Sequence, residues 1–156
     1  MKGTIMETIV QAKRVLEIFK EMSQIPRESG NEKGISDYIV NFAKNLGLEV
    51  HQDEVLNVVI KKAASPGYEN RPSIILQGHI DMVCVKDHDS NHDFTKDPIA
   101  NIIEGEWMRA DHTTLGADNG MGAAMMLALL EDDNQQHGPM QLLFTTNEET
   151  GMDGAF

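Results

Sequence analysis

Three short stretches of this 156-residue chain carry the residues best suited to chemistry, and the first contains a histidine and an aspartate. His79 and Asp81 lie two residues apart, directly after the apolar run 74–76. A β-strand turns alternate residues to the same side, so both side chains can face one way. This spacing suits a metal ligand and the carboxylate that holds its second ring nitrogen. The alternative is a polar pair at a strand end, and the other two stretches decide between these interpretations.

The other two stretches supply carboxylates. Asp118 lies in the glycine-rich turn 116–120, and Glu148 and Glu149 follow the apolar run 140–146. In open α/β sheets, ligands bind in the crevice outside the carboxyl ends of the strands. We therefore expect all three stretches to converge on one crevice.

The residue types in these stretches suit a divalent cation, because imidazole and carboxylate groups are the usual non-thiolate ligands of zinc. A carboxylate has two oxygens, which makes Asp118 the best candidate for a bridge between two ions. Two ions roughly 3.5–4 Å apart can hold an attacking water and a substrate carbonyl together. Neighbouring residues on a regular strand point to opposite faces, so one of Glu148 and Glu149 can bind metal while the other transfers a proton. The residues alone do not decide which glutamate does which.

The carboxylate stretches also have interpretations without chemistry. An aspartate before a helix, as at Asp118, is typical of a cap that interacts favourably with the helix dipole. The pair Glu148 and Glu149 is typical of a solvated turn. The glycines around Asp118 suit tight turns. They do not form a phosphate loop, because no lysine follows them as a P-loop requires.

Four other residues have weaker cases. His88 and His92 stand four residues apart, but no helical pattern surrounds them, so we expect a polar loop and not a ligand pair. His112 lies near Asp118 in the sequence and is a weak candidate for substrate contact. Cys84 has no obvious partner that would stabilise a thiolate, so we expect a buried, small apolar side chain.

The spacing of apolar residues predicts the elements that must position these groups. We expect helices over 5–22, from 31 or 32 to 46, and over 120–131, strands over 48–52, 57–61, 73–77 and 140–146, and a hairpin over 100–110. Asn31 is the expected cap of the second helix, and Gly47 its left-handed end. The strand 73–77 should be buried on both faces and run parallel to 140–146 after a long crossover. The predicted fold class is α/β, a layered mixed sheet with helices on its faces.

The overall composition excludes several classes of protein. A formal charge of −12 argues against nucleic acid or an anionic membrane as a partner. No apolar run is long enough to span a bilayer, and the N-terminus leads into an amphipathic segment and not into a signal peptide. The single cysteine, Cys84, excludes an internal disulfide. Together these features predict a cytoplasmic protein.

Three motifs carry a resemblance to a known family. They are GHIDMV at 78–83, TTLGADNG at 113–120 and TNEETG at 146–151. In these motifs the chain resembles the co-catalytic zinc peptidases of the M20 type, which implies a zinc-exopeptidase-like fold. Within that group it looks like an aminoacyl-histidine dipeptidase, and the segments 26–32, 77–86 and 92–99 also resemble that subgroup.

The resemblance implies a role for each site residue. His79 would bind one zinc ion and Asp81 would orient it. Asp118 would bridge two zinc ions, with a peptide bond after it that is often cis, and Glu149 would bind the second ion. Glu148 would be the general base, passing a proton from a zinc-activated water to the leaving amine of a dipeptide with a C-terminal histidine. Cobalt and manganese are alternative metals.

One position departs from the pattern of the family. The chain has His112 in the segment 111–113, where a glycine is usual in the resembling proteins. This departure lies in the turn that precedes Asp118, so it bears on the backbone conformation there and on the setting of Asp118.

The resemblance also implies a longer protein, because family members are several times longer than 156 residues. They carry a further acidic ligand, a late ligand histidine and a lid or dimerisation domain. We therefore expect residues 1–156 to be the N-terminal portion of a zinc-peptidase catalytic domain. We expect this portion to have little activity alone, low metal occupancy and a tendency to self-associate through uncovered surface.

Two other functions compete with a dipeptidase. One is another amide hydrolase of the M20 type, such as a tripeptidase or an acyl-amino-acid deacylase. The other is a non-catalytic zinc-binding or interaction module. Glu148 argues against the module, because a site that only binds metal needs no base beside the ligand Glu149.

Overall fold

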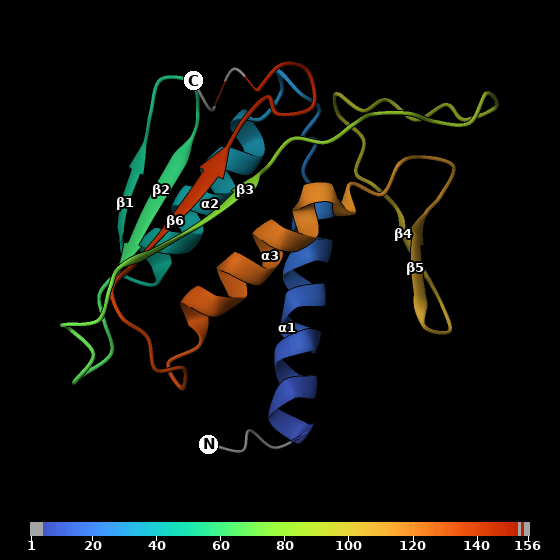
Figure 1. Cartoon of the computed structure of the whole chain (residues 1–156). Helices are drawn as coiled ribbons and strands as arrows, with labels where there is room; N and C mark the ends of the chain where they lie inside the picture. The colour runs from blue at the N-terminus through green and yellow to red at the C-terminus, as the bar shows by residue number, and fades with distance from the viewer. Residues whose placement is uncertain (1–4, 153, 155–156) are drawn as a thin grey trace.

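The computed structural model describes residues 5–152 and 154, which form a mixed α/β fold (Figure 1). Its elements are, in chain order, α1 (Ile5–Ser23), α2 (Lys33–Asn45), β1 (Glu49–Gln52), β2 (Val58–Lys62), β3 (Ile74–His79), β4 (Asn101–Glu104), β5 (Trp107–Ala110), α3 (Ala117–Glu131) and β6 (Met140–Thr145). Each predicted helix and strand is present, and the predicted α/β class is confirmed. Among the residues described, no helix is both long and apolar enough to cross a membrane.

A four-stranded mixed sheet in the order β1-β2-β6-β3 is the centre of the fold. The pairs β1–β2 and β2–β6 are antiparallel, whereas β3 and β6 run parallel, as predicted. Their register places His79 opposite Thr145, so the two strands end side by side. The long crossover between them contains the separate hairpin β4–β5 and the helix α3. Because of this topology, residues that follow β3 and β6 emerge at the same edge of the sheet.

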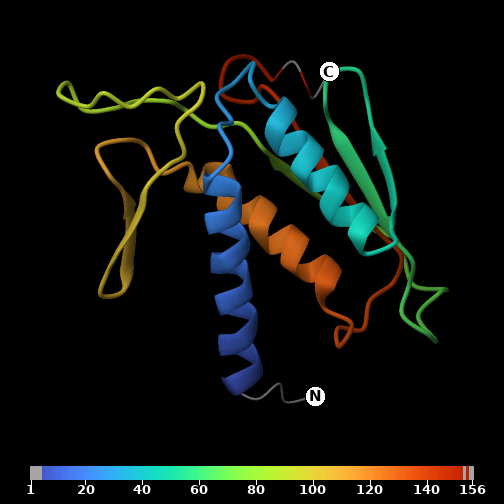
Figure 2. The same cartoon turned by 180° about the vertical axis from the view of Figure 1, so that it is seen from behind.

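One hydrophobic core joins the helices to the sheet (Figure 2). The strand residues in it alternate along β2 and β6, as expected for strands with one buried face. Figure 2 shows α2 in front of the sheet and α1 lying across α3. The fully buried members of this core include Phe19, Met22, Ile35, Ile39, Val58, Ile60, Leu127, Leu142 and Phe144.

The prediction that strand 73–77 is buried on both faces is wrong. Ile74 and Ile75 are 48% and 65% exposed. Among the residues described, β3 pairs only with β6 and therefore lies at the edge of the sheet. An apolar run indicates that a strand is suited to burial, but it does not reveal the position of that strand in the sheet.

The ends of two helices also differ in detail from the predictions. The residue that caps α2 is Glu32, without a side-chain capping bond, and not Asn31. Gly47 does end this helix in the left-handed conformation, with φ +69°. The helix α3 is assigned from Ala117, but its backbone is not helical at Asp118 and Asn119. Regular helix therefore begins close to the predicted position 120.

Candidate metal centre

The imidazole of His79 lies at the carboxyl end of β3 and is almost fully buried. Its Nδ1 lies 3.2 Å from the carbonyl oxygen of Asp81 and 3.3 Å from Oδ1 of the same residue. Both partners are acceptors, so Nδ1 carries a proton. On the other side of the ring, Nε2 lies 3.2 Å from Oδ1 of Asp118. The ring therefore points its second nitrogen at the carboxylates of the predicted site.

The carboxylate of Asp81 is fully buried and connects His79 to the turn after β6. It accepts hydrogen bonds from the Ser29 hydroxyl at 2.7 Å and from the backbone N–H groups of Glu148 and Glu149, each at 3.1 Å. Asp81 thus fixes both the orientation of the imidazole and the position of the two glutamates. Its role as the carboxylate that orients a metal ligand stays a prediction.

The two ionisable groups hold each other in the charged state. Burial alone would raise the pKa of Asp81, but the hydrogen bonds from His79, Ser29 and the two backbone amides hold it well below its usual range. The hydrogen bond to Asp81 raises the pKa of His79 to about 9, against the opposing effect of burial. Without a metal ion, the imidazole is therefore cationic at neutral pH and donates from both nitrogens.

Asp118 approaches the ring from the start of α3 and is largely exposed. The peptide bond between Asp118 and Asn119 is cis, as the family resemblance implies. Gly116, two residues before Asp118, has φ +70°, a left-handed conformation that glycine adopts without steric cost. The exposed carboxylate of Asp118 lies next to the ring of His79 at the end of β3.

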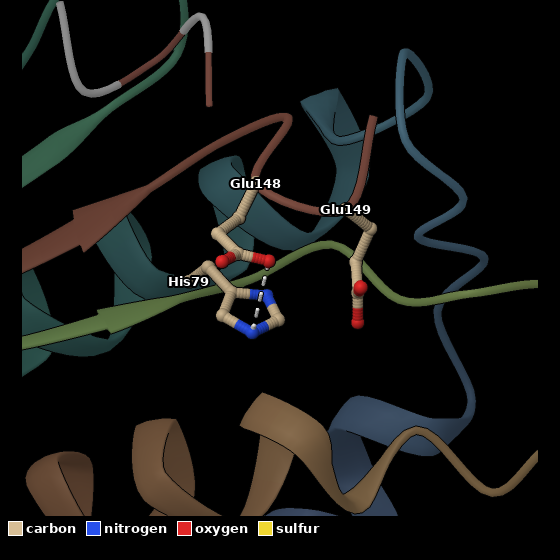
Figure 3. A group of neighbouring side chains, drawn as sticks. All are labelled: His79, Glu148 and Glu149. Atoms are coloured by element: carbon tan, nitrogen blue, oxygen red, sulfur yellow. Dashed lines mark ion pairs between the residues drawn. The ribbon is translucent and has the colours of Figure 1, made fainter. Parts of the chain in front are cut away.

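Glu148 and Glu149 lie in the turn after β6, and both side chains extend from that turn to the side on which the ring of His79 lies (Figure 3). One ligand atom from each of these three residues lies within 4.8 Å of the other two. Oε2 of Glu148 is 3.8 Å from Nε2 of His79. The expectation that adjacent glutamates point to opposite sides does not hold here, because the backbone has left the strand and Asn147 is left-handed at φ +56°.

The donor set fits a divalent metal ion. Ligand atoms of His79, Glu148 and Glu149 lie within 4.8 Å of one another, and a carboxylate oxygen of Asp118 lies 3.2 Å from the imidazole. Imidazole and carboxylate ligands suit zinc and related cations. Histidines that bind metal usually donate their other ring N–H to a carboxylate or a carbonyl, and His79 has both types of partner in Asp81.

The sequence interpretation missed a residue of this network, Ser29. A single serine three residues after Pro26 forms no distinctive pattern. Its contact with Asp81 joins positions 52 residues apart, which local periodicity does not report. The resemblance of segment 26–32 to the dipeptidase subgroup was the available signal.

The other histidines and the cysteine lie outside the cluster. His88 is fully exposed beside Asp89, whereas the ring of His92 packs edge-on against Phe94 at 4.5 Å between centroids. These different environments support the predicted polar loop. Cys84 is partly buried, and burial raises the pKa of its thiol to about 11, which favours the unreactive thiol form.

His112 is exposed and has no hydrogen bond or ion pair with His79, Asp118, Glu148 or Glu149. Its Nδ1 lies 2.7 Å from Oδ2 of Asp87. The backbone at His112 has φ +56°, a region that glycine occupies freely and that histidine tolerates better than most residues. A glycine at this position in the resembling proteins is therefore compatible with the observed turn.

Comparison with known proteins adds to this geometry. The sequence pattern of peptidase family M20/M25/M40 matches residues 75–156, which contain all the clustered residues. The chain belongs to this family of peptidases. The resemblance noted in the sequence is thereby confirmed at the level of the family.

Two relatives within this family are dipeptidases. The chain is 51% identical over 140 residues to the cytosol non-specific dipeptidase of Escherichia coli (strain K12), covering 90% of this chain and 29% of that protein. Its structure matches that of aminoacylhistidine dipeptidase from Vibrio alginolyticus with a TM-score of 0.89 and 48% identity, covering 92% of this chain and 29% of that one. The chain thus spans less than a third of the length of these two relatives.

A tripeptidase from Staphylococcus aureus is a more distant structural relative. The match has a TM-score of 0.75 and 29% identity, and it covers 92% of this chain and 38% of the tripeptidase. The shared structure extends over almost the whole chain in both comparisons, which confirms the predicted fold as that of an M20 catalytic domain.

Replacing Asp81 with asparagine should lower the pKa of His79 from about 9 toward its ordinary value of about 6.5, because the imidazolium loses its anionic partner. The titration can be followed by NMR of the imidazole nitrogens in the metal-free chain. Asp87→Asn is the matched control, since Asp87 faces His112 instead. Equal titration of His79 in wild type and Asp81→Asn would contradict the assigned contact.

Proposed function

We propose that this M20 chain forms part of the active site of a metallodipeptidase. The observation that carries the proposal is the convergence of His79, Asp118, Glu148 and Glu149 at the joint end of β3 and β6. The sequence similarity to two dipeptidases, at 51% and 48% identity over about nine-tenths of the chain, supports peptide hydrolysis as the reaction. The proposed place of action is the cytosol, in line with the name of the Escherichia coli relative.

We further propose that the site holds two zinc ions, with cobalt and manganese as alternative metals. His79 and Asp118 would hold one ion, and Asp118 and Glu149 the other. A divalent ion bound there supplies Lewis-acid polarisation of the scissile carbonyl and lowers the pKa of water.

The remaining roles belong to the side chains of this chain. Glu148 is the general base, which takes a proton from the attacking water and passes it to the leaving amine. Its carboxylate is partly exposed, so both water and substrate can reach it. Asp81 keeps the imidazole of His79 in one orientation and anchors the backbone of both glutamates.

The proposed substrates are dipeptides with a C-terminal histidine. The structural match to an aminoacylhistidine dipeptidase supports this preference. The competing proposal is a dipeptidase of broader range, and it is supported by the identity to a relative named as non-specific. Rates on dipeptides that differ only in their C-terminal residue would separate the two proposals.

We propose that residues 1–156 form the N-terminal portion of the catalytic domain and hydrolyse little substrate alone. The assignment above gives each ion two protein ligands, counting Asp118 twice, whereas catalytic zinc normally has about three. The coverage of 29% of both dipeptidase relatives agrees with a site that needs ligands from a longer polypeptide.

In the full-length protein, Glu148→Gln should lower kcat for a Xaa-His dipeptide by about 10²–10⁴-fold and leave the zinc content unchanged, because the amide cannot accept the proton. Glu149→Gln is the matched neighbour and should lower the zinc content. Assays of both variants, with metal analysis by mass spectrometry, test the assignment. The roles would be reversed if Glu148→Gln lost zinc and Glu149→Gln kept it.

We also propose that the 156-residue chain self-associates through β3. This strand presents an unpaired edge among the residues described, and Ile75 on it is 65% exposed. The molar mass measured by light scattering should rise with concentration for wild type. It should stay at the monomer value of 17.3 kDa for Ile75→Lys, because a charge on an edge strand opposes pairing. A monomeric wild type at high concentration would refute this proposal.

A further inference from the structure

Residues 27–32, the second part of the connection between α1 and α2, contact three separate parts of the candidate metal centre. These parts are the end of β3 at 79–82, the turn at 116–119 and the turn at 146–149, here termed the three arms. None of the side chains in the connection belongs to the proposed ligand set. The connection nevertheless contacts residues that are close in the chain to the proposed ligands.

Arg27 joins the first arm to the second. Arg27 is 2% exposed. Its guanidinium donates from Nη1 to the carbonyl oxygens of Ile80 at 3.1 Å and Asp81 at 3.2 Å, and from Nη2 to that of Gly116 at 2.5 Å. Burial lowers its pKa to about 10, so it remains a cation at neutral pH. A planar guanidinium can reach carbonyls on two sides at once, which a compact ammonium cannot.

The second arm is shaped around this guanidinium. A Cβ atom built on Gly116 would collide with Nη2 of Arg27, and one on Gly120 would lie 2.6 Å from the same atom. Two glycines that flank Asp118 in the sequence therefore leave the space that Arg27 fills. The glycines of this turn therefore make room for Arg27, in addition to allowing the tight bend that the sequence suggested.

Glu32 holds the third arm. Its side chain is buried at 4% exposure, and its Oε1 accepts a hydrogen bond from the backbone N–H of Asn147 at 3.1 Å. Asn147 is the left-handed residue immediately before Glu148 and Glu149. The position of Glu32 therefore sets where the turn that carries both glutamates begins.

The rest of the connection is fixed to the first arm. The Ser29 hydroxyl donates to Oδ2 of Asp81 at 2.7 Å, and the carbonyl oxygen of Arg27 accepts from the N–H of Met82 at 3.1 Å. Glu28 and Met82 form an isolated parallel bridge. The connection is thus paired with the β3 arm along its backbone and reaches the other two arms with side chains.

We propose that residues 27–32 position the three arms relative to one another, with Arg27 and Glu32 as positioning residues that touch neither metal nor substrate. This inference rests on the proposed function, because the spacing of the arms matters only where they share a ligand. The two residues act on different arms: Arg27 on the end of β3 and the turn of Asp118, and Glu32 on the turn of Glu148 and Glu149.

The first test measures the mobility of each arm without metal, through NMR order parameters of the backbone amides. Rigid backbone has an order parameter of about 0.85 and flexible backbone one below about 0.6. Arg27→Lys should lower the value at Asp118 and Asn119, and Glu32→Met should lower it at Glu148 and Glu149. A general loss of stability would lower the order parameters in both variants alike, and would not affect a different arm in each variant.

The second test measures the affinity of the full-length protein for Co²⁺ by its visible absorption, at a temperature where every variant is folded by circular dichroism. Arg27→Lys and Glu32→Met should each weaken binding by about 10–100-fold, the usual effect of losing a group that supports metal ligands. Glu32→Gln keeps an acceptor for Asn147 and should restore binding close to wild type. Arg14→Lys is the distant control, since Arg14 binds Glu131 at the far end of α3.

The outcomes separate the inference from the proposed function. Unchanged order parameters at both arms, or equal changes at all three arms in both variants, would overturn the positioning role. Selective mobility in the two variants, together with a full-length wild type that binds no Co²⁺, would support the positioning role and count against the metal centre. If Arg27→Lys does not fold, Ser29→Ala joins Glu32→Met in the same comparison, with its loss of order expected at 79–82.

Discussion

The buried carboxylate of Asp81 is the interaction on which the candidate site depends. It receives hydrogen bonds from the Ser29 hydroxyl, the backbone amides of Glu148 and Glu149, and the ring of His79. An ionised carboxylate offers about four acceptor positions, so these four donors satisfy it. A buried charge is tolerated only when it is paired and hydrogen-bonded, and the donors are therefore held in fixed relation to one another. Three segments of the chain meet in this way at a single side chain.

The topology of the sheet brings these segments within reach. Parallel pairing of β3 with β6 ends both strands at the same edge, and the crossover between them returns through α3. Asp118 follows His79 by 39 residues, and Glu148 follows Asp81 by 67. Such distant residues meet because parallel strands require a long connection, and here that connection also supplies a carboxylate. The acidic turns repel one another, and the cationic His79 and Arg27 offset part of that repulsion.

Much of this arrangement follows from local sequence, and the remainder follows from contacts that local sequence does not encode. Helical and strand periodicity predicted the elements, and the carboxyl-end rule predicted that His79, Asp118 and the two glutamates would converge. The edge position of β3 was missed, because the apolar run 74–76 indicates an affinity for burial and not a place in the sheet. The common direction of Glu148 and Glu149 was also missed, since it depends on the left-handed backbone before them. The burial of Arg27 and Glu32 depends on partners more than 50 residues away, which no periodicity reveals.

The most direct test of the account is an anomalous difference map from crystals of the protein grown with zinc and measured at the zinc absorption edge. The account predicts a peak bound to Nε2 of His79 and a carboxylate oxygen of Asp118, at distances of about 2.0–2.2 Å. It predicts a second peak that shares Asp118 and is bound by Glu149. Zinc bound elsewhere, with Nε2 of His79 still in contact with Asp118, would contradict the assignment of this cluster as a metal centre.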